Sequence, residues 1–513
     1  MMSKSLVVLS LFFWGLVTPV ITTEGQQVVD YHRLVRTLND SCLYYEITGI
    51  VDLGGKKLVL PEGATIVFKG GRFQNGTIVC RNTVFNGRNG ISDNVKVTGN
   101  VLGPLDISIF ILNREDKSFD IGKVLNRANK ICKSIIVPEG RFYIQTPVKL
   151  TDIRYYQQHG DILYNGLADD ITVIQFYKAY LAVIDILGRI AYAADSPVIN
   201  YTTTKRTNIV GVEFVNINNC NVFVNDVEYF NNNIRISAYG AGNCYNKYTL
   251  NMSVFSNEHV RIFQKDSPLN QIGWCNENIF IGGRFCNWSY FDWNKCESVA
   301  IRIEGATQGD TYNGVNSLLF LKPCMEGFKR NAVYAKNVIG CHWQDVRTED
   351  TETFIKFVGD CRNNEANTLY GSNKYDYSES MTYPLKVNNL HEIYSTTDSN
   401  SKILEIDTRI SKIFKVVFTN NDAKARIGVV YLSEGGDNQV LQSAQSRMMR
   451  PRSTSYPHSY YYNSELGQWL LASDASESEF VIPNNVTKVR LLLTGKYKGA
   501  TIYSDKPVEI IEQ

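Results

Sequence analysis

Two glutamates in the middle of this 513-residue chain stand at equivalent positions of two similar segments, residues 320–326 and 343–349. Each segment begins with an aromatic residue, breaks near its centre and ends in a glutamate, Glu326 or Glu349. Residues 280–286 align with both segments and end in cysteine. If the segments are strands on successive turns of a solenoid, the two glutamates lie on strands roughly 4.8 Å apart. This spacing is close to the roughly 5 Å between the two carboxylates of a retaining glycosidase.

Further charged residues near this pair extend the set of catalytic candidates. Two carboxylates so close disfavour each other's ionised form, which is one way for an enzyme to hold a protonated acid beside an ionised base. The catalytic candidates are Glu326, Glu349, Asp345, Asp350 and Arg347. A structural alternative stays open, in which each glutamate bonds backbone N–H groups of a turn and Arg347 pairs with one of them.

Substrate binding would need cations, hydrogen-bonding groups and aromatic rings near these carboxylates. Arg284 shares an aligned position with Arg347, and Glu304 ends a neighbouring strand. An irregular stretch, residues 287–295, offers tryptophans that could stack on sugar rings. Each kind of residue also has a purely structural alternative. The arginine could form a surface ion pair, the histidine could have a structural role, and the aromatic residues could pack in the core. The substrate-binding candidates are Arg284, Glu304, His342, Trp343, Trp288 and Trp293.

The elements that would position these residues are short strands in a repeating order. Apolar strands at residues 299–303, 332–335 and 354–358 lie between or after the three aligned segments. Each strand is too short to bury a face alone, and such a repeat is typical of a solenoid. We therefore predict coils of a β-helix through residues 276–350, interrupted at 305–314 by a loop suited to form the wall of a cleft.

A helical segment precedes these coils. Residues 121–132 place apolar side chains on one helical face, with Ser118 as the expected N-cap. A strand follows directly, and its Val-Pro-Glu-Gly phrase resembles the Leu-Pro-Glu-Gly of residues 60–63. This order of helix and strand resembles the entry to right-handed parallel β-helices of the pectate lyase and phage tailspike superfamily, in which the helix caps the first coil. The resemblance extends to about Tyr370.

The resemblance implies an all-β fold and a function in glycan chemistry, because the superfamily contains polysaccharide lyases, hydrolases, phage depolymerases and adhesins. The motifs of polygalacturonases are not present together in this chain, so that family is excluded. A calcium-dependent lyase would need an acidic metal site beside a basic residue. The crowded candidates for such a site are Asp345, Glu349 and Asp350 around Arg347. We predict no metal and no cofactor.

The segments on either side of the coils are also predicted to be β-structure. Strands punctuated by glycine and asparagine indicate an N-terminal β-solenoid-like module at residues 24–117, and the β-helix is predicted at 118–395. Asparagines concentrate at its corners, where stacked side chains can hydrogen-bond from coil to coil. After a polar linker at 382–401, short strands in residues 401–513 predict an antiparallel β-sandwich that loosely resembles jelly-roll modules.

Composition and the amino terminus bear on partners and location. Lysine and arginine number 53 and aspartate and glutamate 51, without long runs of one sign, which argues against nucleic acid as a partner. Residues 1–23 have the charged start, apolar core and polar end of a signal peptide, and the core is too short to span a membrane. No cysteine follows that core until Cys42, so no lipoprotein anchor is expected. The 11 cysteines lack zinc-site spacing and are expected to be mostly free and buried.

These observations predict a secreted or periplasmic right-handed parallel β-helix with an N-terminal β module and a C-terminal antiparallel β-sandwich. Its expected partner is a polysaccharide or glycan, with no integral membrane segment in the mature chain and nothing that indicates an oligomer. The preferred reaction is hydrolysis by paired carboxylates. Two alternatives stay open: a polysaccharide lyase that acts by β-elimination, and a glycan-binding or adhesion protein without catalysis.

Overall fold

The computed structural model describes residues 20–21, 29–30, 38 and 43–513, apart from the internal segments named at the end of this paragraph. The chain divides into two compact units, Met1–Ile162 and Leu163–Gln513, and each is described by itself. The segments left out are 111, 169, 194–207, 266–272, 288–297, 307–313, 329, 360, 381–384, 386–389, 399, 420–425, 433–458, 464–467, 474–476, 483–486 and 495–496.

The first unit contains the predicted N-terminal β module. Its strands alternate buried and exposed residues, and Tyr45, Ile66 and Phe85 stack in register inside it. All of these strand pairs are parallel, as in a solenoid. The main strands are β3 (Tyr44–Ile47), β4 (Ile50–Asp52), β6 (Thr65–Phe68), β7 (Arg72–Gln74), β8 (Gly76–Gly87) and β9 (Val95–Val101).

The amino-terminal segment is described only in part. Within residues 1–23, the predicted signal peptide, the structure describes β1 (Val20–Ile21), which pairs in parallel with β3. The rest of that segment lies outside the described residues. The signal peptide stays a prediction.

The predicted helix is present as α2 (Ile121–Ile131), but its N-cap differs from the expected residue. Asp120 caps the helix, because its Oδ1 accepts hydrogen bonds from the backbone N–H of Gly122 at 3.1 Å and of Gln145 at 3.0 Å. The expected cap, Ser118, instead donates its hydroxyl to Asp116 at 2.7 Å. The choice of Ser118 was therefore wrong. A carboxylate suits this position, since one oxygen can serve both the helix and the adjacent strand.

Helix α2 buries one apolar face within the first unit. It contacts β9 of the N-terminal module and also β12 (Arg141–Ile144) and β13 (Val148–Thr151) of the strands that follow it. Covering exposed strand edges and core is the expected task of such a helix. Because the module also packs against α2, the helix joins two β-regions as well as covering the first coil.

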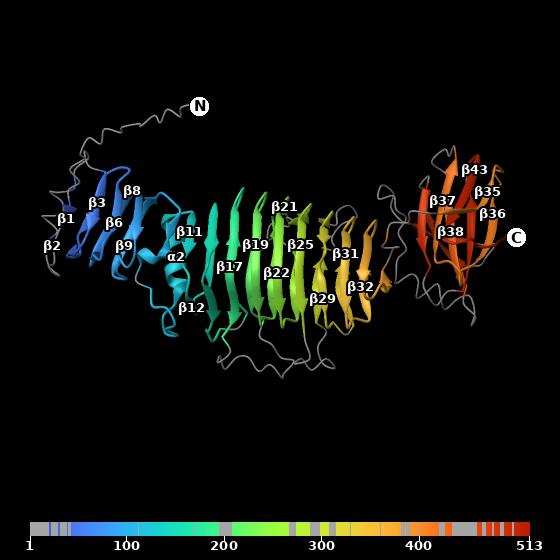
Figure 1. Cartoon of the computed structure of the whole chain (residues 1–513). Helices are drawn as coiled ribbons and strands as arrows, with labels where there is room; N and C mark the ends of the chain where they lie inside the picture. Colours follow the sequence, from blue (N-terminus) through green and yellow to red (C-terminus); the bar gives the residue numbers. More distant parts are fainter. Residues whose placement is uncertain are drawn as a thin grey trace, which may run out of the picture. The chain divides into compact units, whose positions relative to one another are not determined.

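The second unit contains a right-handed parallel β-helix, which confirms the predicted fold. Three sets of parallel strands, which we call sheets 1, 2 and 3, run along it (Figure 1). In the second unit, sheet 1 consists of β17 (Val183–Tyr192), β19 (Asn221–Glu228), β22 (Lys247–Val254), β25 (Ile279–Cys286), β28 (Leu319–Leu321), β29 (Cys324–Glu326), β31 (His342–Glu349) and β33 (Glu365–Tyr370).

Sheets 2 and 3 complete the coils. The strands of sheet 2 in this unit are β16 (Thr172–Tyr177), β18 (Val210–Val215), β20 (Asn232–Tyr239), β23 (Glu258–Lys265), β26 (Val299–Glu304), β30 (Asn331–Lys336), β32 (Thr353–Gly359) and β34 (Tyr375–Ser380). Those of sheet 3 are β21 (Gly242–Cys244), β24 (Trp274–Asn276) and β27 (Val315–Asn316). The apolar strands predicted at 299–303, 332–335 and 354–358 correspond to β26, β30 and β32.

A column of aromatic rings fills the interior behind sheet 1. The rings of Tyr248 and Phe280, of Phe280 and Phe320, and of Phe320 and Trp343 are stacked, with centroids 5.0, 4.6 and 5.6 Å apart. Each ring comes from a successive coil at the same position. Large rings at this position bury apolar area and fix the register, since a slip by one residue would place them on the surface.

Asparagine ladders at the corners confirm the structural interpretation of the asparagine-rich stretch. Asn246, 1 % exposed, accepts from the backbone N–H of Cys220 at 2.9 Å and donates to the carbonyl oxygen of Ile217 at 2.9 Å. The Oδ1 of Asn278, one coil later, accepts from the backbone N–H of Asn246 at 3.0 Å. These side chains satisfy backbone groups that the corner removes from the sheets.

The C-terminal segment packs two antiparallel sheets around one apolar core, as predicted. The core contains residues of both sheets, among them Leu404, Phe414, Leu491 and Ile502. One sheet has the order β35-β43-β37-β41 and the other β39-β40-β38-β42-β36-β44. Their bounds are β35 (His391–Thr396), β36 (Lys402–Asp407), β37 (Ile413–Thr419), β38 (Arg426–Leu432), β39 (Ser459–Asn463), β40 (Gln468–Ser473), β41 (Glu477–Val481), β42 (Lys488–Thr494), β43 (Gly499–Ser504) and β44 (Ile510–Glu512).

The start of this antiparallel unit lies earlier than predicted. Strand β35 falls in the segment assigned to the end of the β-helix and its linker, but it pairs antiparallel with β43. Its polar composition concealed this, because β35 is an edge strand with mostly exposed or half-buried residues. No helix in the part of the chain that the structure describes is long and apolar enough to cross a membrane.

The ladder predicts a large loss of stability on removal of one asparagine. We expect Asn246→Ala to lower the free energy of unfolding by about 2 kcal/mol, because a buried N–H and a buried carbonyl lose their partner. Asn251→Ala is the matched control, since Asn251 is exposed and bonds Asn225 at 2.8 Å across the same coils. Urea unfolding of both variants measures the difference. Equal midpoints for the two would contradict the assigned role of the ladder.

Candidate functional site

The alignment of the three segments predicted from the sequence is present in the structure. Glu326 of β29 pairs in register with Cys286 of β25 and with Glu349 of β31. The two glutamates therefore occupy one position on adjacent coils of sheet 1. We call Cys286, Glu326 and Glu349 the carboxylate column.

Glu326 is held by four side-chain contacts. Arg284 binds it with two N–H groups, Nε to Oε1 at 3.2 Å and Nη2 to Oε2 at 3.0 Å. The thiol of Cys286 contacts Oε2 at 3.3 Å, and that of Cys324 contacts Oε1 at 3.2 Å. Only 12 % of the Glu326 side chain is exposed, against 50 % for Arg284. A two-pronged guanidinium pair of this kind favours the ionised carboxylate.

The two thiols around Glu326 are neutral donors. Burial, with the nearby Glu326 carboxylate, raises the pKa of Cys286 to about 12. Burial and the hydrogen bond to Glu326 raise the pKa of Cys324 to about 11. At neutral pH both sulfurs therefore keep their protons, so each thiol can donate a hydrogen bond to Glu326. All nine cysteines among the described residues are free, as predicted for most of them, and Cys324 is the half-buried one.

Glu349 is the more accessible carboxylate of the column. Its side chain is 33 % exposed and forms an ion pair with Arg347, which is 55 % exposed. The guanidinium of Arg347 also lies 5.8 Å from the ring centre of Tyr370 on the next coil. The hydrogen bond to Glu349 and its charge raise the pKa of Arg347, so this residue keeps its proton. This ion pair between Arg347 and Glu349 agrees with the structural alternative, in which Arg347 pairs with one of the two glutamates.

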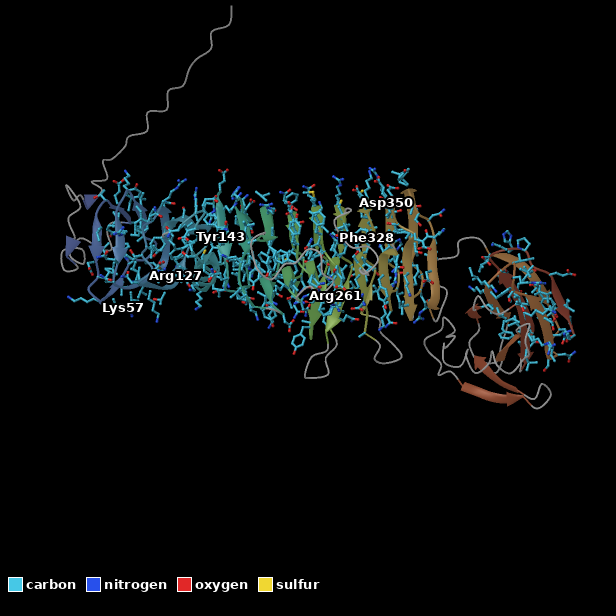
Figure 2. All side chains as sticks on the ribbon, turned by 90° about the horizontal axis from the view of Figure 1, so that it is seen from below. Lys57, Arg127, Tyr143, Arg261, Phe328 and Asp350 are labelled. Atoms are coloured by element: carbon cyan, nitrogen blue, oxygen red, sulfur yellow. The ribbon has the colours of Figure 1, made fainter. Side chains whose placement is uncertain are left out.

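The two aspartates of the candidate set stand at corners of the coil. Asp345 (φ 54°) shares its position with Gly282 and Lys322, which are also left-handed, and Asp350 (φ 49°) shares its position with Gly327. Both side chains are exposed, and Figure 2 shows Asp350 at the margin of the coil. Aspartate tolerates the left-handed region better than most residues. The left-handed backbone at these two positions therefore explains why aspartate is found there.

The structure separates the remaining substrate-binding candidates. Trp343 was expected to contact substrate, but it is fully buried in the ring column and is a core residue. His342 is partly exposed, and its Nδ1 lies 3.2 Å from a carboxylate oxygen of Glu365 on the next coil. Trp288 and Trp293 lie outside the described residues, as does most of the predicted loop at 305–314.

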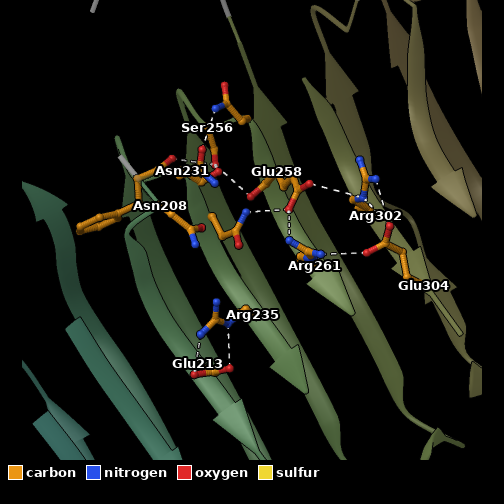
Figure 3. A network of polar contacts seen from close by, with 12 residues as sticks. Asn208, Glu213, Asn231, Arg235, Ser256, Glu258, Arg261, Arg302 and Glu304 are labelled. Carbon is orange, nitrogen blue, oxygen red and sulfur yellow. Dashed lines mark hydrogen bonds and ion pairs between the residues drawn. The ribbon is translucent and has the colours of Figure 1, made fainter. Parts of the chain in front are cut away.

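Glu304 belongs to a different surface from the carboxylate column. It lies in β26 of sheet 2, where Arg261 donates to it at 2.9 Å and Arg302 at 3.0 Å (Figure 3). Arg302 also pairs with Glu258 at 3.4 Å, and Arg261 with Glu258 at 3.5 Å. The structure thus brings together Glu326, Glu349, Arg284 and Arg347, but it excludes Glu304 from their group.

Sheet 2 carries an arginine ladder that the sequence analysis missed. Arg235, Arg261 and Arg302 occupy one register position on three successive coils, and Glu213 occupies it on the coil before. Arg235 binds Glu213 at 2.7 and 3.0 Å. Glu213 is 4 % exposed and accepts further bonds from Thr172, Gln175 and Ser237.

Electrostatics favours the charged forms throughout this ladder. Burial alone would raise the pKa of Glu213, but the hydrogen bond and charge of Arg235 lower it. Burial likewise opposes ionisation of Glu304, and Arg302 and Arg261 overcome it and lower its pKa. Arginines stacked at one register position repel each other, so each needs an acidic partner. The ladder is a charge-balanced structural network and offers no protonated acid.

A signal for the ladder was present in the sequence. Ile234-Arg235-Ile236, Val260-Arg261-Ile262 and Ile301-Arg302-Ile303 each place one arginine between two branched apolar residues. Aligning sheet 2 strand by strand, as was done for sheet 1, would have found it. Among the described residues, no group of three or more His, Cys, Asp or Glu side chains is arranged to hold a metal ion.

No protein-family model and no curated protein matches the sequence. The tailspike protein of Acinetobacter phage vB_ApiP_P1 is similar at 9 % identity over 95 % of this chain and 88 % of that chain, with a TM-score of 0.27. The enzymatically active domain of tailspike protein 4 of bacteriophage CBA120 matches at 11 % identity over 94 % and 68 %, with a TM-score of 0.16.

A further similar structure is tailspike protein gp49 of Acinetobacter baumannii bacteriophage Fri1, a capsular polysaccharide depolymerase. Its identity is 9 % over 95 % of this chain and 85 % of that chain, with a TM-score of 0.16. Phage tailspike proteins are thus among the structures to which this chain is similar. The parallel β-helix itself is established by the strand pairing of this chain.

The buried pair of Arg235 and Glu213 predicts a pH-dependent loss of stability in Arg235→Met. The ladder stabilises the wild type above the unfolded pKa of glutamate, and this contribution is lost as the pH falls through the lowered folded pKa. Without the guanidinium, burial raises the pKa of Glu213, so the folded variant binds a proton more tightly than the unfolded chain. We expect a loss of roughly 3 kcal/mol at pH 7 and a smaller loss at pH 5.

Urea unfolding at the two pH values measures this effect. Arg409→Met is the control, because Arg409 pairs with Asp407 at a 64 % exposed position. An exposed pair contributes less than about 1 kcal/mol. A loss for Arg235→Met that is the same at both pH values would contradict the proposed role of the arginine.

The raised thiol pKa values predict slow alkylation of the folded protein. Burial also raises the pKa of Cys341 to about 12. At pH 8 we expect iodoacetamide to label Cys286, Cys324 and Cys341 at least about tenfold more slowly than in urea, because the thiolate is the reacting form. Peptide mass spectrometry gives the rate for each cysteine. Rapid labelling of Cys286 in the native protein would show that its sulfur is accessible or ionised.

Proposed function

We propose that this protein binds a polysaccharide on sheet 1 and cleaves a glycosidic bond at the carboxylate column. The observation that carries the proposal is the register of Glu326 with Glu349. Side chains at one position of adjacent parallel strands lie roughly 4.8 Å apart, close to the separation used by retaining glycosidases. Secretion or export to the periplasm is part of the same proposal, since it would bring the protein to an external glycan.

The surroundings of the two glutamates suggest their roles. Glu326 is nearly buried and bound by Arg284, so it would act as the ionised nucleophile that bonds to the anomeric carbon. Glu349 is more exposed, so it would give a proton to the leaving oxygen and then take a proton from the attacking water. The exposed Arg347 would have to release Glu349 when the substrate binds, since the acid must be protonated in the first step.

A glycan-binding protein without catalysis is the second candidate, and one observation favours it. Both glutamates are paired with arginines, which favours ionisation of both rather than of one. Polysaccharide cleavage by β-elimination is less well supported. Its basic candidate, Arg347, has a raised pKa through its hydrogen bond to Glu349 and would not accept a proton.

A panel of neutral and acidic polysaccharides would test the proposal. New reducing ends without absorbance of unsaturated products would indicate hydrolysis, and unsaturated products would indicate elimination. Retention of a polysaccharide without either product would support the glycan-binding alternative. No product and no retention across the panel would contradict both candidates.

The proposed roles of the two carboxylates predict that cleavage is lost when either one is removed. We expect Glu326→Gln and Glu349→Gln each to lower the rate of reducing-end formation by about 10³-fold, because the nucleophile or the acid is lost. Glu365→Gln is the matched control on sheet 1, where Glu365 pairs with His342 outside the column. Near-normal rates in both column variants would remove the site.

A further inference from the structure

Sheet 3 and its corner present two exposed aromatic side chains. Trp274 is 42 % exposed and Tyr245 is 58 % exposed, whereas the rings of the column behind sheet 1 are buried. Trp274 opens β24, and Tyr245 directly follows β21 on the preceding coil. Exposed aromatic rings that the fold holds in place are a common mark of a binding surface.

The indole of Trp274 packs against the backbone of the preceding coil. Trp274 pairs in register with Gly242, and a Cβ atom at Gly242 would come within 2.4 Å of the indole Nε1. The indole therefore lies directly against the Gly242 backbone. Burial raises the pKa of the Cys244 thiol, and the neighbouring Trp274 side chain partly offsets this. The ring is thus positioned by packing against the Gly242 backbone, although much of its surface faces solvent.

Tyr245 is fixed in a comparable way. It stands at a left-handed corner (φ 58°), a position that it shares with Asn219 and Glu277 of the neighbouring coils. The neighbouring Glu277 carboxylate raises the pKa of the Tyr245 hydroxyl. A bulky residue is costly in this backbone region, so the corner imposes the direction of the side chain.

Trp274 and Tyr245 precede the sheet 1 strands along the coil, whereas the carboxylate column lies at the other end of those strands. Strand β25 runs from Ile279, 38 % exposed and two residues after Glu277, to Cys286 of the column. Seven residues separate the two ends, with left-handed Gly282 and Gly283 between them, so the ends are at most about 23 Å apart. Ile281, half-buried, faces the same side as Ile279 between the two ends. A long polymer lying across this strand would reach both places, whereas a short oligomer would reach only one.

We infer that Trp274 and Tyr245 form a stacking platform for a neutral polysaccharide chain that extends along β25. This inference deepens the proposed function, because it assigns a substrate class and a distant subsite, on sheet 3 and its corner, to the same coils. The apolar faces of sugar rings pack on aromatic rings, and the Tyr245 hydroxyl and the Glu277 carboxylate offer partners to sugar hydroxyls. The nearest charged residues along the chain, Glu277 and Lys247, have opposite signs, so the platform has no excess positive charge for an acidic polymer.

Binding to an array of neutral and acidic glycans tests the inference. All variants carry Glu326→Gln and Glu349→Gln, so that no bound polymer is cleaved. We expect the parent to bind neutral long-chain glycans, and Trp274→Ala and Tyr245→Ala each to weaken that binding at least tenfold. Trp274→Phe keeps an aromatic ring packed against Gly242 and should retain most of the binding.

The control is Tyr44→Ala in the first unit. Tyr44 is also exposed and donates its hydroxyl to a glutamate, Glu46, at 3.1 Å. Equal urea midpoints for all variants would show that they remain folded. Binding that is unchanged in Trp274→Ala, a preference for acidic glycans, or no binding by the parent would each overturn the inference.

The same samples separate the inference from the proposed cleavage. Binding that depends on Trp274, in a wild-type protein that cleaves nothing, would support the platform and contradict the catalytic role of the column. Cleavage of a long polymer with KM unchanged in Trp274→Ala, made in the wild-type background, would support the column and overturn the platform.

Discussion

Parallel stacking in register is the constraint on which this structure depends. A side chain in a strand of one coil has as its neighbour the residue in register on the next coil, roughly 4.8 Å away. An apolar position is therefore best filled by rings that stack, as from Tyr248 to Trp343. A corner position is best filled by amides that can bond both the backbone and one another, as in Asn246 and Asn278.

The same constraint makes charged positions costly, because identical charges would be neighbours along the whole solenoid. The structure shows two ways of balancing them. On sheet 2 the three arginines of the ladder receive glutamates from their own and adjacent positions. On sheet 1, Glu326 and Glu349 take their cations from the position two residues earlier, and protonated thiols add neutral donors to Glu326.

This balance bears on the choice between catalysis and binding. The arginines of the ladder are less exposed than Arg284 and Arg347, the partners of the column. They lower the pKa of Glu213 and Glu304 and so favour the ionised forms. The column is smaller and opens to solvent at Glu349, where one ion pair is exposed. Exposed pairs contribute little to stability, so a substrate could displace Arg347 at small cost. For this reason we propose the column, rather than the ladder, as the place for chemistry.

The sequence by itself determined the β-helix, the helix before it, the antiparallel C-terminal unit and the register of Glu326 with Glu349. These follow from local patterns: short apolar strands in a fixed order, a change of period at residues 121–132, and segments that align residue by residue. It could not show that Asp120 rather than Ser118 caps α2, because the choice depends on the strand at Gln145. Nor could it show that Trp343 faces inward, that Glu304 lies on another sheet, or that Trp274 is held exposed above Gly242. Only the tertiary structure decided these points, because the direction of a side chain depends on which coil lies beside it.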